Sequence, residues 1–363
     1  MNTLITALLL AGQIAESDYS RFYGLMEKER EARNAARYAE AERLGREAEI
    51  VARRLPDPGG RLTWVRVDLG IVLGWQGRFD EAIRVLEEAL PPAMKLSTRE
   101  HLSVAVQLGA TYRAVGRLDE AQLVLRRALR ADGAGELPVA LAARSQLARI
   151  EDLLGRRQAA RAMYLEVLAE QTLRLGNTHI DTLSTLAGLI EFSIKWKRYD
   201  DAEKLALRYR DDNAQAEAAS HPSNAFGHYY LGILDTKRKR YEKASEKLHL
   251  ALGILEATVG QRGANVTPVL DALAFVEIKL GHLGAALELR REAVSICEKT
   301  YGPRHRLTAL MLHKYADLQG RLHFRDEARQ NRAKAIAIDK ESAAFSQAGR
   351  TIEWDTFRRE AGR

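Results

Sequence analysis

Three histidines could do acid–base or metal chemistry, because they recur at one position of a repeating pattern: His179, His221 and His305. A neutral imidazole binds metal ions and moves protons near neutral pH. The nine histidines of the chain do not cluster at ligand spacing, however. Each of the three precedes a repeated alanine by 23 residues. We therefore interpret them as loop residues that pack on or cap the next helix, with a ligand role as the alternative.

Other catalytic patterns are missing from the sequence. It contains no His-Glu-x-x-His, no Gly-x-Ser-x-Gly, no phosphate-binding loop with lysine and no dinucleotide fingerprint. Cys297 is the only cysteine, so neither an intrachain disulfide nor a cysteine-built zinc site can form. Glu81, Glu120 and Asp201 stand where second helices are expected to start, where acidic groups favour the helix dipole. The sequence predicts no catalytic residue, no metal site and no cofactor.

The composition is that of a folded chain with mixed surface charge. Of its 363 residues 46% are hydrophobic and 29% are charged. Lys and Arg number 56 against 49 Asp and Glu, which gives a formal net charge of +7. The two signs alternate along most of the chain, which is typical of solvated helix faces. This pattern argues against nucleic acid as the partner.

The first residues form an apolar run, Leu4 to Gly12, without a polar face. Its length suits the core of a signal peptide and is too short to span a membrane. No Lys or Arg precedes it, and no clean cleavage site follows. We expect residues 1–16 to be a signal peptide or an apolar N-terminal segment. The run favours export to the periplasm or cell envelope, with a cytoplasmic location as the alternative, and no other stretch predicts a transmembrane helix.

The elements that must position any site come from an internal repeat. A short motif of an aromatic or leucine, acidic residues and alanine recurs, and its marker alanines are Ala41, Ala82, Ala121, Ala160, Ala202, Ala244, Ala286 and Ala328. The last four steps between them are 42 residues each. Such regular spacing predicts a repeat architecture rather than two or three independent domains.

Each unit has the same internal plan. Leucine stands thirteen residues before the marker alanine, as at Leu69, and a small residue such as Gly70 follows it. A turn residue, often glycine as at Gly77, stands five before the alanine, and another small residue, such as Ala89, stands seven after it. Small residues let two helices approach closely, and glycine ends the first helix in a left-handed conformation. The plan predicts two antiparallel helices per unit, stacked on their neighbours.

These residues resemble the tetratricopeptide-repeat signature. The 42-residue units resemble the longer kinesin-light-chain type, in which Gly-x-x-His-x-x-Thr precedes the first helix, as from Gly176 to Thr182. The resemblance implies an all-α, right-handed superhelical solenoid over residues 17–338, followed by a tail or capping segment at 339–363. Its eight units are expected near 17–55, 61–95, 99–132, 138–174, 181–215, 223–258, 266–300 and 307–338.

Some units depart from the plan. Glu29 and Gly45 occupy positions that elsewhere hold a small and a large apolar residue, respectively. Such a unit suits the end of a solenoid, where one face meets water. Near the other end, Arg290 and Arg332 replace the large apolar residue.

The resemblance implies that the first helices of the pairs line a concave groove. Kinesin-light-chain repeats tend to carry asparagine there to hold a peptide backbone, and here only Gln107 and Gln146 offer an amide. The aromatic residues expected on this side are Trp64, Trp75, Tyr229 and Tyr230. Aromatic residues of this kind are frequent anchors for protein partners. The alternative is that they pack between repeats.

A row of cations recurs seven residues before the marker alanines: Lys195, Lys237, Lys279 and Arg321. One interpretation is dipole complementarity, since a cation near a helix C-terminus stabilises it by about 0.3–1 kcal/mol. The other is a basic row that attracts an acidic segment of a partner. The sequence thus predicts a non-catalytic scaffold for another protein. A regulatory subunit of a separate enzyme and a basic nucleic-acid-binding solenoid are the alternatives, and partner and oligomeric state stay open.

Overall fold

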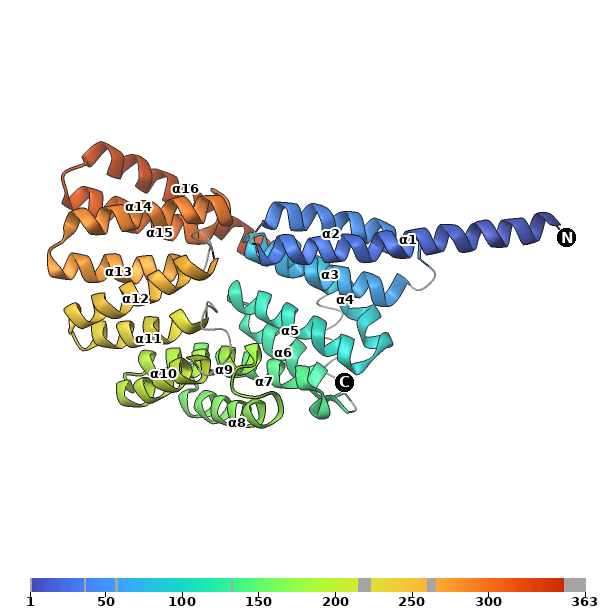
Figure 1. Ribbon diagram of the computed structural model, residues 1–363, viewed down its shortest axis with the longest axis horizontal. Helices are drawn as coiled ribbons and strands as arrows, with labels where there is room; N and C mark the ends of the chain where they lie inside the picture. The colour runs from blue at the N-terminus through green and yellow to red at the C-terminus, as the bar shows by residue number, and fades with distance from the viewer. Residues whose placement is uncertain are drawn as a thin grey trace. The chain divides into compact units, whose positions relative to one another are not determined.

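A computed structural model describes residues 2–35, 37–55, 58–131, 133–214, 223–259 and 266–348. Every regular element among these residues is a helix: sixteen α-helices and one short 3-10 helix (Figure 1). The all-α prediction is therefore confirmed. We call the first helix of each pair an A helix (odd numbers) and the second a B helix (even numbers).

The helices form eight consecutive pairs. Their bounds are α1 (Asn2–Asn34) and α2 (Tyr38–Ala52), α3 (Pro58–Trp75) and α4 (Phe79–Leu96), α5 (Thr98–Ala114) and α6 (Leu118–Leu129), α7 (Pro138–Leu153) and α8 (Arg157–Leu175), α9 (Ile180–Lys195) and α10 (Tyr199–Ala214), α11 (Ser223–Lys237) and α12 (Tyr241–Val259), α13 (Thr267–Leu280) and α14 (Leu283–Thr300), and α15 (Arg306–Arg321) and α16 (Arg325–Ala348). The 3-10 helix η1 (Ala134–Glu136) precedes α7. The two helices pack together in pairs such as α11 and α12, and B helices such as α12 pack on the A helix that follows, here α13.

The chain divides into two compact units, whose boundary lies within α7. Unit 1 comprises Met1–Gln146, and unit 2 comprises Leu147–Ala348. A core around Phe22 and Leu69 joins the first helices of unit 1. Unit 2 contains one core around Leu186 and a second around Leu273.

The turn from A to B helix requires a left-handed residue. The predicted turn glycines all have positive φ: Gly77 (76°), Gly116 (80°), Gly155 (76°) and Gly281 (88°). In three other repeats the same position holds a side chain: Lys197 (58°), Lys239 (61°) and His323 (67°). A residue with a Cβ atom pays roughly 1–2 kcal/mol for this conformation. Three turns are therefore built at some cost in stability.

The residue twelve before the marker alanine, on the A helix, is matched in size to the residue four after it, on the B helix. A Cβ atom on Gly109 would meet Leu125 Cγ at 2.8 Å, and one on Gly232 would meet Leu248 Cγ at 2.8 Å. In the first pair, a Cβ atom on Gly45 would meet Cδ2 of Leu69 on α3 at 2.8 Å and Cγ of Glu29 on α1 at 4.0 Å. The space beside Gly45 is therefore taken mainly by the leucine of the next A helix.

The two chain ends differ from the predicted boundaries. Helix α1 runs from Asn2 to Asn34 across the expected break after residue 16 and extends past α2 (Figure 1). The fold therefore gives no support to a separate signal segment, which stays a prediction. Helix α16 continues to Ala348. The rest of the predicted tail, 349–363, lies outside the described residues, and no helix in the described part is long and apolar enough to cross a membrane.

Candidate functional site

Two of the three recurrent histidines cap helices. Nδ1 of His179 accepts a hydrogen bond from the backbone N–H of Asp181 at 3.2 Å. Nδ1 of His305 accepts one from Leu307 at 2.9 Å, and its ring stacks on that of Tyr301 at 4.7 Å between centroids. Burial lowers the pKa of His305 to about 4, so its ring is neutral at physiological pH. The capping interpretation is confirmed for both, whereas His221 lies outside the described residues.

Titratable groups elsewhere among the described residues do not assemble into a metal site. In the part of the chain that the structure describes, no three His, Cys, Asp or Glu side chains gather closely enough to hold a metal ion. Cys297 is buried, and burial raises the pKa of its thiol. The candidate site is therefore sought among the predicted groove residues.

The two tryptophans of unit 1 are partly engaged in packing. Trp64 is 43% exposed, and its ring lies 5.7 Å from that of Phe22 and 6.3 Å from that of Tyr23 on α1. Trp75 is 42% exposed and lies 5.2 Å from the ring of Tyr38. Each ring thus joins its helix to a neighbour and leaves part of its surface in solvent.

The two glutamines predicted to hold a peptide are both half-buried. Oε1 of Gln146 on α7 accepts a hydrogen bond from Nε of Arg113 on α5 at 3.3 Å. This contact links two A helices and occupies an acceptor that a peptide would need. Gln107 lies on α5, and its backbone oxygen accepts a hydrogen bond from Thr111.

The adjacent tyrosines of α11 have different environments, because successive helix positions are rotated by about 100°. Tyr230 is 5% exposed and belongs to a core of unit 2, and its hydroxyl donates to Glu191 on α9 at 3.2 Å. Tyr229 is half-buried, and burial raises its pKa to about 12. The structure thus corrects the prediction for Tyr230, which is a core residue rather than a surface anchor.

Lys195 also departs from its predicted role. Its Nζ lies 3.0 Å from Oδ1 of Asp152 and donates to the backbone oxygen of the same residue at 3.1 Å. Nε1 of Trp196 donates to the same carboxylate at 2.8 Å. This cation is neutralised and ties α9 to α7, so it is not a free member of the predicted row.

The remaining three cations, which we call the basic row, are Lys237, Lys279 and Arg321. They lie in the last turns of α11, α13 and α15, and all three are exposed. Nζ of Lys279 lies 5.3 Å from the ring centroid of Phe275. Among the described residues, no acidic side chain forms an ion pair with any member of the basic row. Three successive A helices therefore present uncompensated positive charge.

Apolar side chains accompany two members of the basic row, Lys237 and Lys279, on the same helix faces. Phe275 and Ile233 stand four residues before Lys279 and Lys237, so each pair shares one face of its helix. Phe275 is 42% exposed, and Ile233 is half-buried. The sequence prediction missed both residues, although a search of positions four before each cation would have found them. We call Ile233, Phe275 and the basic row together the A-helix face.

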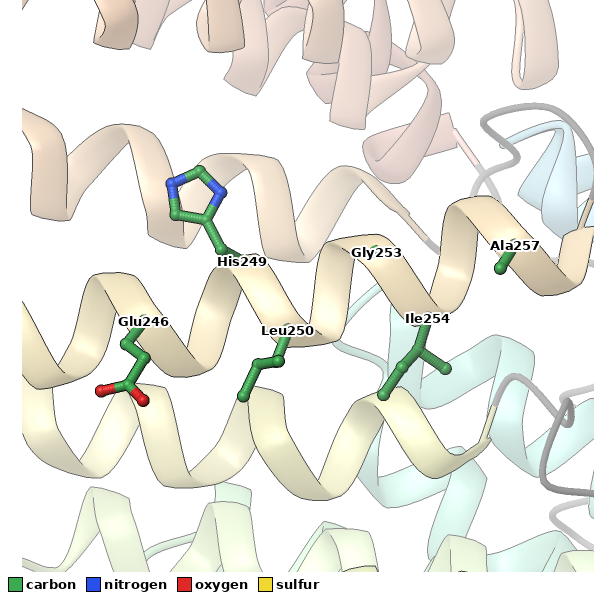
Figure 2. Close-up of a pocket in the computed structure, with 6 residues that line it drawn as sticks. All are labelled: Glu246, His249, Leu250, Gly253, Ile254 and Ala257. Atoms are coloured by element: carbon green, nitrogen blue, oxygen red, sulfur yellow. The ribbon is translucent and has the colours of Figure 1, made fainter.

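A separate hollow of about 600 Å³ lies on α12 (Figure 2). Its lining residues are Glu246, His249, Leu250, Gly253, Ile254 and Ala257. All six come from one B helix, and His249 points to the opposite side from Leu250 and Ile254 (Figure 2). Glu246 points to the same side as Leu250 and Ile254, so the two titratable side chains do not converge with each other on a common ligand position (Figure 2).

The comparisons with known proteins agree with the repeat pattern. A family model described as the tetratricopeptide repeat matches residues 65–134 and 267–341. The protein KINESIN LIGHT CHAIN-RELATED 2 of Arabidopsis thaliana is 23% identical over 248 residues, which are 66% of this chain and 37% of that protein. Both matched stretches of the chain are tetratricopeptide repeats. The repeats of this chain resemble those of kinesin light chains. The chain spans only 37% of the length of the Arabidopsis relative.

Solved structures support the same fold. A Rap protein complexed with competence and sporulation factor is 13% identical with a TM-score of 0.54, over 90% of this chain and 99% of that one. A signal transduction ATPase with a tetratricopeptide repeat sensor, from Pyrococcus horikoshii, is 15% identical with a TM-score of 0.54, over 93% of this chain and 49% of that one. The predicted all-α repeat solenoid is confirmed.

Proposed function

We propose that this tetratricopeptide-repeat protein is a non-catalytic scaffold that binds an acidic segment of another protein along the A-helix face of unit 2. Tetratricopeptide repeats generally mediate protein–protein interaction. The observation that carries the finer proposal is the basic row, in which Lys237, Lys279 and Arg321 recur on successive A helices without an acidic partner among the described residues.

Helix-dipole complementarity alone accounts for part of this arrangement. It would place a cation at each A-helix C-terminus, and Lys195 shows that such a cation can also be neutralised by a neighbouring carboxylate at 3.0 Å. It does not account for the exposed Phe275 beneath Lys279. An aromatic side chain next to a cation offers a partner both an apolar anchor and a charge contact. The combination favours a segment that carries carboxylates and apolar side chains together.

The comparisons are compatible with this proposal at the level of fold. The Rap structure, which shares the fold over most of both chains, is a complex with competence and sporulation factor. The Pyrococcus horikoshii protein carries its tetratricopeptide repeat as a sensor. Both show that this architecture occurs in proteins with a binding or sensing role. A regulatory subunit of a separate enzyme would use the same face in the same way.

The proposal is tested with an acidic probe peptide, a short fluorescein-labelled peptide rich in Glu and Leu. Its affinity is measured by fluorescence anisotropy at low and at high salt. Charge reversal in Lys237→Glu/Lys279→Glu should weaken binding about tenfold at low salt and less at high salt, because salt screens exposed charges. The matched control is Lys204→Glu/Lys243→Glu, which changes the net charge equally on the exposed faces of B helices α10 and α12.

The control decides between a specific face and general electrostatics. Equal losses in the two double variants would overturn the assignment to the A-helix face. The same titration with a single-stranded RNA oligonucleotide tests the nucleic-acid alternative. In that case charge reversal should weaken binding whether it is made on the A helices or on the B helices. RNA binding tighter than that of the acidic probe peptide would replace the proposal.

A further inference from the structure

Arg290 occupies a position that belongs to the hydrophobic core in other repeats. It stands four residues after its marker alanine, where Leu86, Leu125 and Leu248 stand in theirs. Arg290 is only 4% exposed, and its guanidinium contacts the carboxylate of Asp271 on α13. Its Nε is buried and meets no hydrogen-bond acceptor among the described residues. Burial lowers its pKa to about 10.

A second cation shares the same carboxylate. Nζ of Lys314 on α15 lies 2.6 Å from Oδ2 of Asp271. The side chain of Lys314 is 35% exposed and that of Asp271 25%, so the cluster opens to solvent. The nearby His313 is paired with Asp339 at 2.8 Å. Two cations from α14 and α15 therefore share one carboxylate from α13, which leaves one positive charge over.

This arrangement costs stability. Removing a cation from water is costly, and replacement of buried ionic groups by apolar residues of similar volume is often neutral or stabilising. The leucines of the other repeats show which apolar residue the position accepts. A local rule is thus broken without a compensating gain in the fold, and such places are frequently functional.

We propose that Asp271, Arg290 and Lys314 form an anion site that takes a carboxylate of the bound segment. We call it the Arg290 site. The excess cation provides the charge, the Lys314 side chain, which is 35% exposed, provides a donor that a ligand can reach, and the geometry of a carboxylate matches that of a guanidinium. The inference rests on the proposed function, because Asp271 stands four residues before Phe275 on the same face of α13. A carboxylate at the Arg290 site would place a neighbouring apolar side chain at Phe275.

The carboxylate could come from an acidic side chain or from a chain terminus. Two versions of the acidic probe peptide distinguish these sources, one with a free C-terminus and one amidated. Equal affinities assign the site to side-chain carboxylates, and a loss of binding on amidation assigns it to the terminus. An amidated peptide with Gln in place of every Glu carries no carboxylate and should not bind in either case.

The decisive variant is Arg290→Leu, which restores the residue found in the other repeats. We expect its thermal unfolding midpoint to be equal to or above that of the wild type, while its affinity for the acidic probe peptide falls about tenfold. Lys314→Met should lower the affinity in the same direction. The matched control is Arg332→Leu, which removes the arginine at the equivalent position of the last repeat, where it is half exposed and paired with Asp317.

Three results would overturn the inference. One is that Arg290→Leu binds the probe as the wild type does while Lys237→Glu/Lys279→Glu does not, which leaves the proposed function standing. A second is a lower unfolding midpoint of Arg290→Leu, because it would show that the arginine is kept for stability. Loss of probe binding in the Arg332→Leu control equal to that in Arg290→Leu would also contradict a site at this repeat.

Discussion

A Cβ atom on Gly70 would lie 2.6 Å from Cγ of Leu86, so this glycine on α3 and this leucine on α4 fit each other as one unit. A larger residue at either position would displace the residue at the other. The exchange of sizes in the pair α9 and α10, where Ile190 and Ala206 hold these positions in one core, shows that the sum of the two volumes is what the fold requires. Close packing of the interior explains why.

The first prediction is that changes at these two positions compensate. Leu86→Ala should lower the free energy of unfolding by about 2–5 kcal/mol through the cavity it leaves, and Gly70→Ile should also be destabilising through overcrowding. The double variant reproduces the Ile190 and Ala206 pair and should lose less than the sum of the single losses, by about 0.5–3 kcal/mol. Urea unfolding measures this coupling. Strict additivity, as expected for Leu86→Ala combined with Leu248→Ala in another repeat, would show that volume is not shared.

The second prediction concerns the left-handed turns. Lys239 has φ of 61° and is exposed, whereas Gly281 holds the equivalent position in the next repeat. Lys239→Gly should therefore raise the free energy of unfolding by about 1 kcal/mol, and Gly281→Lys should lower it by a similar amount. Chemical denaturation of both variants measures the difference. Destabilisation by Lys239→Gly would mean that the lysine makes a contact that outweighs its backbone cost.

Much of this fold follows from the sequence because the residues that determine it act locally. Gly77 and Gly281 predict their turns through backbone freedom alone, and the marker alanines predict where helices approach. Lys239 shows the limit of that reasoning, since the same turn forms there without glycine. The boundary between the two units falls inside α7, where no composition change marks it.

The third prediction is a pH dependence that originates at His305. Its pKa is lowered to about 4 in the folded protein from an ordinary value of 6.5, so the unfolded chain binds more protons between these values. The stability that neutral His305 contributes is therefore complete above pH 6.5 and is lost as the pH falls towards 4. His305→Asn keeps a cap that does not titrate. As the pH falls through this window, the wild type should lose unfolding free energy relative to the variant. A difference between the two that does not change with pH would contradict a neutral histidine cap.

The fourth prediction concerns the buried carboxylate Glu29. Burial raises its pKa, although Arg33 Nε lies 3.1 Å away, because the same guanidinium is also shared with Asp68 at 3.3 Å. The stability that Glu29 contributes is complete below its unfolded pKa near 4.5 and is lost as the pH rises through the higher folded value. Glu29→Gln should thus be more stable than the wild type at pH 7, with the gain fading in acid. Glu27→Gln, on an exposed position of α1, is the control and should change little.

The candidate site was less predictable, because it depends on contacts between residues far apart in the sequence. Lys195 has the same spacing as the basic row, yet Asp152, 43 residues earlier, neutralises it. Tyr230 differs from Tyr229 only by helix register, and that difference buries it. Arg290 was visible as a departure from the repeat plan, but its neighbour Lys314 could be identified only once α13, α14 and α15 were placed side by side.

The basic row also sets a length scale. Its cations recur once per repeat on A helices, and α11 and α13 contact each other directly. Packed helix axes lie about 8–10 Å apart, and an extended chain advances about 3.3 Å per residue. A strand crossing these helices would therefore meet one cation at about every third residue. The solenoid would therefore select partners by the spacing between their carboxylates as well as by the number of carboxylates.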